Sequence, residues 1–296
     1  MRAPHLHLPH FHLPLHFRDR PLAGKPDPSV PFHWKLYICE SLATAILMIC
    51  GIISVTLLTA PGSPVAELLG AHSTVQIALC GLCFGLSGSI AAYTPFGKVS
   101  GAHLNPSVTL AFLLAGRIVW LDAFGYFSAQ IIGAIEGTLL VSLFGDAVEP
   151  WGQWAYAAHY AATIPNPQVS AFIPLLSETG VTALLIGMLY WLASHQEMRW
   201  LTPWAGGLFF LVMNPLTAWL SGNSVNLARS FAPAVFSAEW SGFWIYILGP
   251  FAGSALAVYC IKTDLFGKIH LAEARLINFG HKGRVPDLTN PEAKSP

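Results

Sequence analysis

The stretches GAHLNPSVTL (residues 101–110) and GNSVNLARSF (residues 222–231) interrupt two long apolar parts of one chain in the same way. In each, a glycine is followed after a short spacer by an asparagine, and then by a run of helix-forming residues. Asparagine is a favoured helix N-cap, and Pro106 suits the first position of a helix. We therefore predict that a short helix starts after Asn105 and another after Asn226.

The composition of the chain places it in a lipid bilayer. Of its 296 residues, 54% are hydrophobic and only 10% are charged, whereas soluble domains carry about 25% charged residues. The net charge is zero, which argues against nucleic acid as a partner. All five cysteines lie in apolar runs, so we expect buried free thiols and no disulfide framework.

Six apolar segments are long enough to span a membrane, which takes about 20 residues. We predict spans at 36–60, 73–94, 121–144, 171–193, 203–220 and 241–261. Two further apolar segments, 106–115 and 227–236, are too short to span. A half-length helix at membrane depth has to be buried in protein or line a wet cavity, and both of these begin at the quoted stretches.

The basic residues predict the orientation. In a six-span arrangement, every Lys and Arg except Arg229 falls on one side, and the loops 61–72 and 145–170 contain none. By the positive-inside rule, both termini of this multi-pass protein of a plasma or inner membrane are expected to be cytoplasmic. Arg229 is then isolated on the outer side, within the second stretch, which suggests a functional role.

The domain prediction has three parts. Residues 1–34 are expected to form a disordered cytoplasmic tail rich in His and Pro, residues 35–262 a channel-like domain, and residues 263–296 a mostly solvated cytoplasmic tail. We expect the aromatic loop 145–170 to pack at the membrane interface. The first tail holds five histidines that a divalent metal could bind: His5, His7, His10, His12 and His16. No fixed ligand geometry follows from their spacing, so we predict no metal site.

The two halves, about 35–144 and 171–262, are predicted to be an inverted repeat. Each contains three spans, an odd number, so the second copy enters the membrane from the opposite face, and a site is expected near the midplane. The first span of each half carries a glutamate, Glu40 or Glu178. We expect both carboxylates to accept N–H groups of the non-helical loops before the half-helices, and Gln130 to act similarly.

In an inverted repeat, the two half-helices meet N-terminus to N-terminus. Each helix end carries a partial positive charge of about +0.5, and Asn105 and Asn226 add amide N–H donors. Such a site repels cations and protons and orients a neutral hydrogen-bonding molecule. Arg229 lies one turn into the second half-helix. We expect it to line the pathway, and a role in pinning loop backbone is compatible with that.

Four quoted segments resemble the aquaporin, or major intrinsic protein, family: SGAHLNPSVTLAF (100–112), YFSAQIIGAIEG (126–137), NSVNLARSFAPAV (223–235) and GPFAGSALAV (249–258). The resemblance covers about residues 36–262. It implies an all-α membrane protein with six transmembrane helices and two half-helices, assembled as a homotetramer with one pore per protomer.

The resemblance also implies a central constriction made by paired Asn-Pro-Ala motifs. Here these are Asn105-Pro106-Ser107 and Asn226-Leu227-Ala228, which both depart from the family pattern. Leu227 has to fill by apolar packing the space that a proline takes in relatives. Because Asn226 keeps its donor, we expect the pore to survive.

A narrower outer filter is implied at four positions: Phe84, Asn214, Asn223 and Arg229. Strict water channels of the family usually have His at the position of Asn214. Glycerol facilitators have Gly there and a second aromatic residue in the loop that holds Asn223. Asparagine at both positions suggests an opening wider than with His, without the apolar face that fits the glycerol backbone.

We predict a passive water channel that also passes small neutral solutes, with no enzymatic activity and no cofactor. The alternative within the family is a facilitator of glycerol, urea, ammonia or hydrogen peroxide. A coupled secondary transporter would need a titratable or cation-binding cluster at the midplane. A non-conducting member, with Leu227 closing the constriction, is a further alternative.

Overall fold

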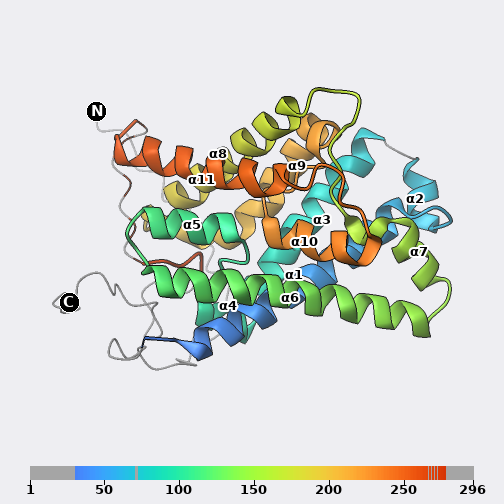
Figure 1. Ribbon diagram of the computed structural model, residues 1–296, viewed down its shortest axis with the longest axis horizontal. Helices are drawn as coiled ribbons and strands as arrows, with labels where there is room; N and C mark the ends of the chain where they lie inside the picture. The colour runs from blue at the N-terminus through green and yellow to red at the C-terminus, as the bar shows by residue number, and fades with distance from the viewer. Residues whose placement is uncertain are drawn as a thin grey trace, which may run out of the picture.

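The computed structural model describes residues 31–70, 73–265, 267, 269, 271 and 273–277, and this part of the chain is helical. Six long helices form the bundle in Figure 1: α1 (Trp34–Thr59), α3 (Thr74–Tyr93), α6 (Trp120–Ala147), α8 (Phe172–Ser194), α9 (Thr202–Ser221) and α11 (Ile245–Lys262). They correspond one to one to the six predicted spans, with boundaries within a few residues.

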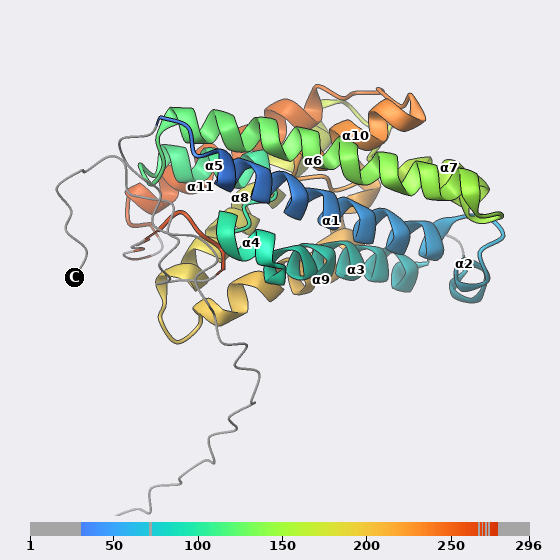
Figure 2. The same cartoon turned by 90° about the horizontal axis from the view of Figure 1, so that it is seen from below.

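Five of these helices, all but α9, are long and apolar enough to cross a membrane. Helix α9 has 20 residues, as many as α3, but Asn214 and two prolines lower its apolar character. It packs closely against α3 within the bundle (Figure 2). The predicted span 203–220 is therefore a helix of the bundle, although its composition alone does not identify it as a membrane span.

Two short helices lie end to end between the long ones (Figure 1). They are α5 (Pro106–Leu114) and α10 (Leu227–Ser237). The side chain of Asn105 accepts the backbone N–H of Ser107 at 2.8 Å, and that of Asn226 accepts the N–H of Arg229 at 3.2 Å. Both asparagines are thus N-caps, which explains why each short helix begins where it does.

The helix contacts follow the pattern of an inverted repeat. Helix α1 packs against α3 and α6, and α8 packs in the same way against α9 and α11. Each short helix crosses to the other half: α5 packs against α11, and α10 against α6. The hydrophobic core is accordingly divided into two clusters, one around α8 and α11 and one around α1 and α10.

Close approach of α3 and α9 depends on glycine. A Cβ on Gly81 would lie 2.2 Å from the carbonyl oxygen of Phe210, and one on Gly85 would lie 2.6 Å from that of Gly206. Small residues at helix contacts let backbones approach closely in membrane proteins. The α3–α9 contact is therefore fixed by these glycines, and both helices contribute to the cavity described below.

Short elements cover the two ends of the bundle. At one end, called the α7 end, lie α2 (Pro64–Leu69), α7 (Trp151–Ala157) and the single turn η1 (His159–Ala161). At the other, the α4 end, lie α4 (Pro95–Ser100) and η2 (Arg199–Leu201) (Figures 1 and 2). Part of the aromatic loop 145–170 lies inside the bundle, because residues 158, 161, 162 and 164 line the cavity.

The last residues that the structure describes differ from the expectation of a mostly solvated tail. Leu271 and residues 274–277 are buried, including Arg275, which has no exposed surface. They are held against α4 and the loop that follows it, because Arg275 donates to the Lys98 and Val99 carbonyls and the Leu276 N–H donates to the Gly101 carbonyl. Average polarity over 263–296 concealed this short apolar segment.

Other predictions are tested only in part. The predicted disordered tail lies outside the described residues up to residue 30, and so do its five histidines. All five cysteines are free and half-buried. Among the described residues, no group of three His, Cys, Asp or Glu side chains is placed to hold a metal ion.

Candidate pore

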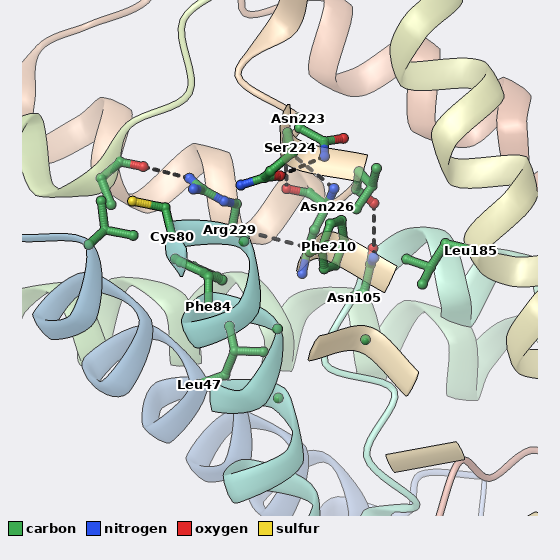
Figure 3. A pocket seen from close by; sticks show the side chains of 18 of the residues that line it. Leu47, Cys80, Phe84, Asn105, Leu185, Phe210, Asn223, Ser224, Asn226 and Arg229 are labelled. Atoms are coloured by element: carbon green, nitrogen blue, oxygen red, sulfur yellow. Dashed lines mark hydrogen bonds between the residues drawn. The ribbon is translucent and has the colours of Figure 1, made fainter. Parts of the chain in front are cut away.

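A cavity of about 490 Å³ runs between the helices of both halves. Its walls come from α1, α3, α8 and α9, from the loops before α5 and α10, and from the loop after α7. Six of the residues singled out by the sequence lie on it: Phe84, Asn105, Asn214, Asn223, Asn226 and Arg229. Figure 3 shows Asn105 and Asn226 side by side, with Arg229, Phe84 and Cys80 grouped next to them.

Asn105 and Asn226 are tied to each other's loops by a reciprocal pair of hydrogen bonds. Asn105 Nδ2 donates to the carbonyl of Val225 at 2.9 Å, and Asn226 Nδ2 donates to the carbonyl of Leu104 at 2.9 Å. Each amide nitrogen carries two hydrogens, so each keeps a second N–H. The two half-helices therefore meet at a polar point of the cavity where four amide hydrogens are held in fixed positions.

The two buried glutamates hold the loop backbones. Glu178 accepts from the N–H of Ser224 at 2.8 Å, from the N–H of Val225 at 2.7 Å and from the Ser221 hydroxyl at 2.7 Å. Glu40 accepts from the N–H of Leu104 at 2.5 Å.

Glu40 is joined to the rest of its half through Gln130. Gln130 Nε2 donates to Glu40 Oε1 at 2.8 Å and to the Thr109 hydroxyl at 3.0 Å. Glu40 Oε2 has no hydrogen-bond partner among the described residues. Buried loop N–H groups without water need such acceptors, and Glu178 serves more of them than Glu40 does.

Both loops have left-handed backbone at matching positions. The positive φ values occur at Gly101, Ala102 and Leu104 in the first loop and at Gly222, Asn223 and Val225 in the second. Such conformations cost energy in residues other than glycine and persist where the surroundings over-determine them. The surroundings here include a buried tyrosine for each loop: Tyr126 donates to the Ser100 carbonyl, and Tyr246 to the Ser221 carbonyl.

Arg229 is held beside the cavity by a carbonyl and a ring. Its Nη1 donates to the carbonyl of Ala161 at 2.6 Å, and its Cζ lies 4.4 Å from the centroid of the Phe84 ring. Figure 3 shows the guanidinium directed past Cys80. The sequence did not identify Ala161, because a backbone carbonyl leaves no signature in residue type.

The Ala161 carbonyl depends on unusual backbone geometry. His159, Tyr160 and Ala161 all have positive φ, a rare run for residues other than glycine. Tyr160 packs into the core against Phe236. The strained turn therefore aims a carbonyl at Arg229, as expected when strain is retained at a functional site.

The two filter asparagines are bonded to each other. Asn223 Nδ2 donates to Asn214 Oδ1 at 2.7 Å, and Asn214 Nδ2 lies 3.4 Å from the Ile77 carbonyl. Asn223 Oδ1 is buried and has no hydrogen-bond partner among the described residues. The pair thus forms one polar wall with an unused acceptor beside the cavity.

The remaining motif residues lie behind the cavity wall. Pro106, Ser107 and Ala228 are buried and Leu227 is half-buried, and none of the four lines the cavity. The Ser107 carbonyl accepts from the Ser254 hydroxyl at 2.8 Å, which anchors α5 to α11. In this structure Leu227 does not enter the cavity.

At the α4 end, two further residues reach the cavity. His103 lines it, stacked on Phe112 with ring centroids 4.7 Å apart, and so does Leu276 near the end of the described chain. His103 Nε2 bonds the Ala274 carbonyl at 2.8 Å. A tail residue 171 positions away in the sequence could not be linked to His103 by any sequence pattern.

Comparison with known proteins gives one consistent result. The profile of the family described as Major intrinsic protein matches residues 28–260. A glycerol uptake facilitator protein-like 6 from Lactiplantibacillus plantarum is 33% identical, over 77% of this chain and 97% of its own length. A probable aquaporin NIP7-1 from Arabidopsis thaliana is also 33% identical, over 77% of this chain and 76% of its own.

More distant matches agree. The human lens fiber major intrinsic protein is 28% identical, over 87% of this chain and 90% of its own length. The X-ray structure of the aquaglyceroporin from Plasmodium falciparum superposes with a TM-score of 0.61 at 20% identity, over 78% of this chain and 96% of that one. The chain is thus a non-enzymatic, multi-pass membrane channel that belongs to the major intrinsic protein family.

Proposed function

We propose that this channel conducts water passively and passes only the smallest neutral solutes, through the cavity that Asn105, Asn226 and Arg229 line. The observation that carries the proposal is the polar filter: Arg229, Asn214 and Asn223 face the cavity with Phe84 as its one aromatic member. Water offers donors and acceptors in every direction, so it suits walls that are polar on several sides.

The filter offers both kinds of hydrogen-bonding partner. Arg229 supplies N–H donors, and Asn223 Oδ1 is a buried acceptor with no partner among the described residues. A buried, unsatisfied acceptor costs about 1–3 kcal/mol, which a passing water removes by donating to it. A glycerol molecule has a carbon face as well, for which this filter has only the Phe84 ring.

Exclusion of protons and cations follows from fixed positive charge. The N-terminal ends of α5 and α10 meet at the two asparagines, and each contributes a partial charge of about +0.5. Arg229 adds a full charge, half-buried beside the Ala161 carbonyl. A water at the centre also accepts an N–H group from each asparagine, so it donates to the neighbouring waters but has no lone pair left to accept a proton from them.

Glycerol facilitation is the second candidate. A relative named as a glycerol uptake facilitator protein is 33% identical and is matched over 97% of its length. The cavity, about 490 Å³ in volume, is lined by Gly88 and Gly206, where even an added Cβ would meet no atom closer than 3.6 Å, so one wall has space. The Asn214–Asn223 bond decides between the two candidates, because a tied pair narrows the filter and a released pair widens it.

The arrangement in the membrane is part of the proposal. We infer that the α4 end is cytoplasmic and the α7 end is outside, because every Lys and Arg that the structure describes, apart from Arg229, belongs to the former. Residues 35–262 form the channel domain. The exposed aliphatic and aromatic side chains around the bundle contact lipid and, in a homotetramer, neighbouring protomers.

The test is stopped-flow light scattering on proteoliposomes. Shrinkage against an impermeant osmolyte measures water flux, and re-swelling in an inward glycerol gradient measures solute flux. Fast shrinkage with glycerol flux at the level of empty liposomes supports the water channel. Fast re-swelling in glycerol overturns it in favour of the second candidate, and baseline rates for both overturn the two together, provided that the protein is monodisperse.

A further inference from the structure

The last described residues of the chain fold back onto the α4 end of the cavity. Residues 273–277, here called the C-terminal segment, follow α11 and return towards α4 (Figure 2). Leu276 lines the cavity. The segment therefore belongs to the pore wall, at the opposite end from the Arg229 filter.

Arg275 fixes the segment to α4. Its side chain has no exposed surface, and its Nη2 donates to the carbonyls of Lys98 at 2.6 Å and Val99 at 2.9 Å. Both carbonyls lie in the last turn of α4, where a helix has no partners of its own for them. A charged donor at a helix C-terminus is doubly favourable, through the hydrogen bonds and through the helix dipole.

Backbone bonds join the segment to the first loop. The N–H of Leu276 donates to the Gly101 carbonyl at 2.9 Å, and the Ala274 carbonyl lies 2.8 Å from His103 Nε2. Because a carbonyl can only accept, His103 carries its hydrogen on Nε2. Its Nδ1 then accepts from the Thr109 hydroxyl, 3.0 Å away.

Those bonds connect the segment to the constriction. Thr109 accepts from Gln130, which also donates to Glu40, and Glu40 accepts the N–H of Leu104. Leu104 in turn supplies the carbonyl that binds Asn226. The segment therefore sits at the end of one continuous hydrogen-bond chain that runs to the centre of the pore.

Two neighbouring apolar side chains of the segment pack into different core clusters. Leu276 belongs to the core cluster that contains Val99 and Leu189, whereas Ile277 belongs to the other cluster, with Leu47 and Ala102. Both side chains are buried. The segment therefore bridges the two clusters at the α4 end of the bundle, with Leu276 on the cavity.

At the α7 end, the loop after α7 packs on the second loop much as the C-terminal segment packs on the first, but it is attached differently. Gly101 faces Ala274 and Arg275, as Gly222 faces Thr163 and Ile164 in the loop after α7. That loop is anchored by a helix on each side. The C-terminal segment follows α11, the last helix among the described residues, so its release requires no helix to move.

We propose that the C-terminal segment is an autoinhibitory gate of the pore. Docked through Arg275, it places Leu276 and Ile277 across the α4 end and stops flux, and its release opens the channel. This rests on the proposed function for the identity of the permeant. The docking itself is independent of which solute passes.

The test compares two shortened chains in proteoliposomes. One ends at Lys268 and lacks the segment, and its matched control ends at Asn278 and keeps it. Water permeability per protein is measured by stopped-flow light scattering, with size-exclusion profiles as the check on folding. Hydrogen bonds to a charged group are strong enough that their loss shifts a docked-to-released ratio about tenfold or more. We expect a rise of that order for the chain ending at Lys268 and none for the control.

A point variant in the full chain isolates Arg275. Arg275→Gln removes the charge and one of the paired donors, and we expect it to raise water permeability nearly as far as the truncation does. Arg284→Gln, which removes the same charge further along the chain, is the control and should leave permeability unchanged. Equal permeability of the full chain and the Lys268-ended chain, both well above empty liposomes, overturns the gate while leaving the proposed function intact.

A second readout does not depend on flux. A thiol introduced by Leu276→Cys is titrated with a soluble maleimide, relative to the background of the five native cysteines. We expect protection in the otherwise native chain and fast labelling when Arg275→Gln is added. If no form conducts, the proposed function fails, and this labelling decides the gate by itself: equal protection in both chains overturns it.

Discussion

The two re-entrant loops of this channel share a scaffold and differ in what they attach to it. In both, a buried carboxylate accepts loop N–H groups, a buried tyrosine binds a serine carbonyl, and an asparagine caps a half-helix and bonds the opposite loop. The second loop adds Arg229 and Asn223. The first instead adds His103, which bonds the C-terminal segment.

This difference separates structure from selectivity. Features that occur in both loops hold the backbone in a non-helical path at membrane depth, a need that both loops have equally. Features found in only one loop lie at opposite ends of the cavity, a cationic filter at one end and a cover at the other. We therefore expect residues found in only one loop to set the selectivity of the channel, and residues found in both loops to set its stability.

The largest effect is expected where the two carboxylates differ. Glu178→Gln leaves one loop N–H facing an amide NH₂ instead of an oxygen, because both oxygens of Glu178 accept backbone N–H groups. An unsatisfied buried donor costs about 1–3 kcal/mol. We expect a lower midpoint of thermal unfolding in detergent, as measured by circular dichroism.

The matched variant Glu40→Gln should be much milder. Its amide oxygen can replace Oε1, which accepts both bonds, and its NH₂ can replace Oε2, which has no partner among the described residues. Equal losses of stability in the two variants would contradict the distinction between these carboxylates.

Arg229→Val should let protons through. At an effective dielectric constant of about 20, a unit charge roughly 8 Å from a passing cation contributes about 2 kcal/mol to its barrier, which is more than tenfold in rate. The measurement is the rate of internal acidification of proteoliposomes after a pH jump. The equivalent position in the first loop is Val108, which is buried, and Val108→Ala should cause no leak.

Asn223→Ala is expected to widen the filter. It removes the bond to Asn214 and gives the second loop the residue type that Ala102 has at the matching place in the first. Loss of about 1 kcal/mol of selectivity corresponds to roughly a fivefold rise in glycerol flux relative to water flux. An unchanged ratio would show that the tied asparagines do not set the opening.

The smallest effects should be equal in both halves. Tyr126→Phe and Tyr246→Phe each remove one hydrogen bond, to Ser100 and Ser221 respectively. A lost hydrogen bond of this kind costs about 1 kcal/mol. Matching shifts in thermal midpoint are expected, and a large difference between the two would break the symmetry of the scaffold.

Much of this architecture could be predicted because it depends on local chemistry. Five of the six long helices follow from apolar length, and both half-helices begin at an asparagine because that side chain caps a helix. The pairing of Glu40 and Glu178 with the loops was predicted from the repeat, since a buried carboxylate needs donors. Residue type and spacing carry all of that information.

What only the tertiary structure decided are contacts made by backbone groups and by distant segments. The Ala161 carbonyl on Arg229 depends on a left-handed turn, and any residue supplies a carbonyl. The bond between Asn214 and Asn223 depends on the side chains of α9 and the second loop meeting across the cavity. The burial of Arg275 against α4 joins positions 177 residues apart. Composition predicted a solvated tail there. Whether one short apolar segment is buried depends on the surface against which it packs, and composition does not show that surface.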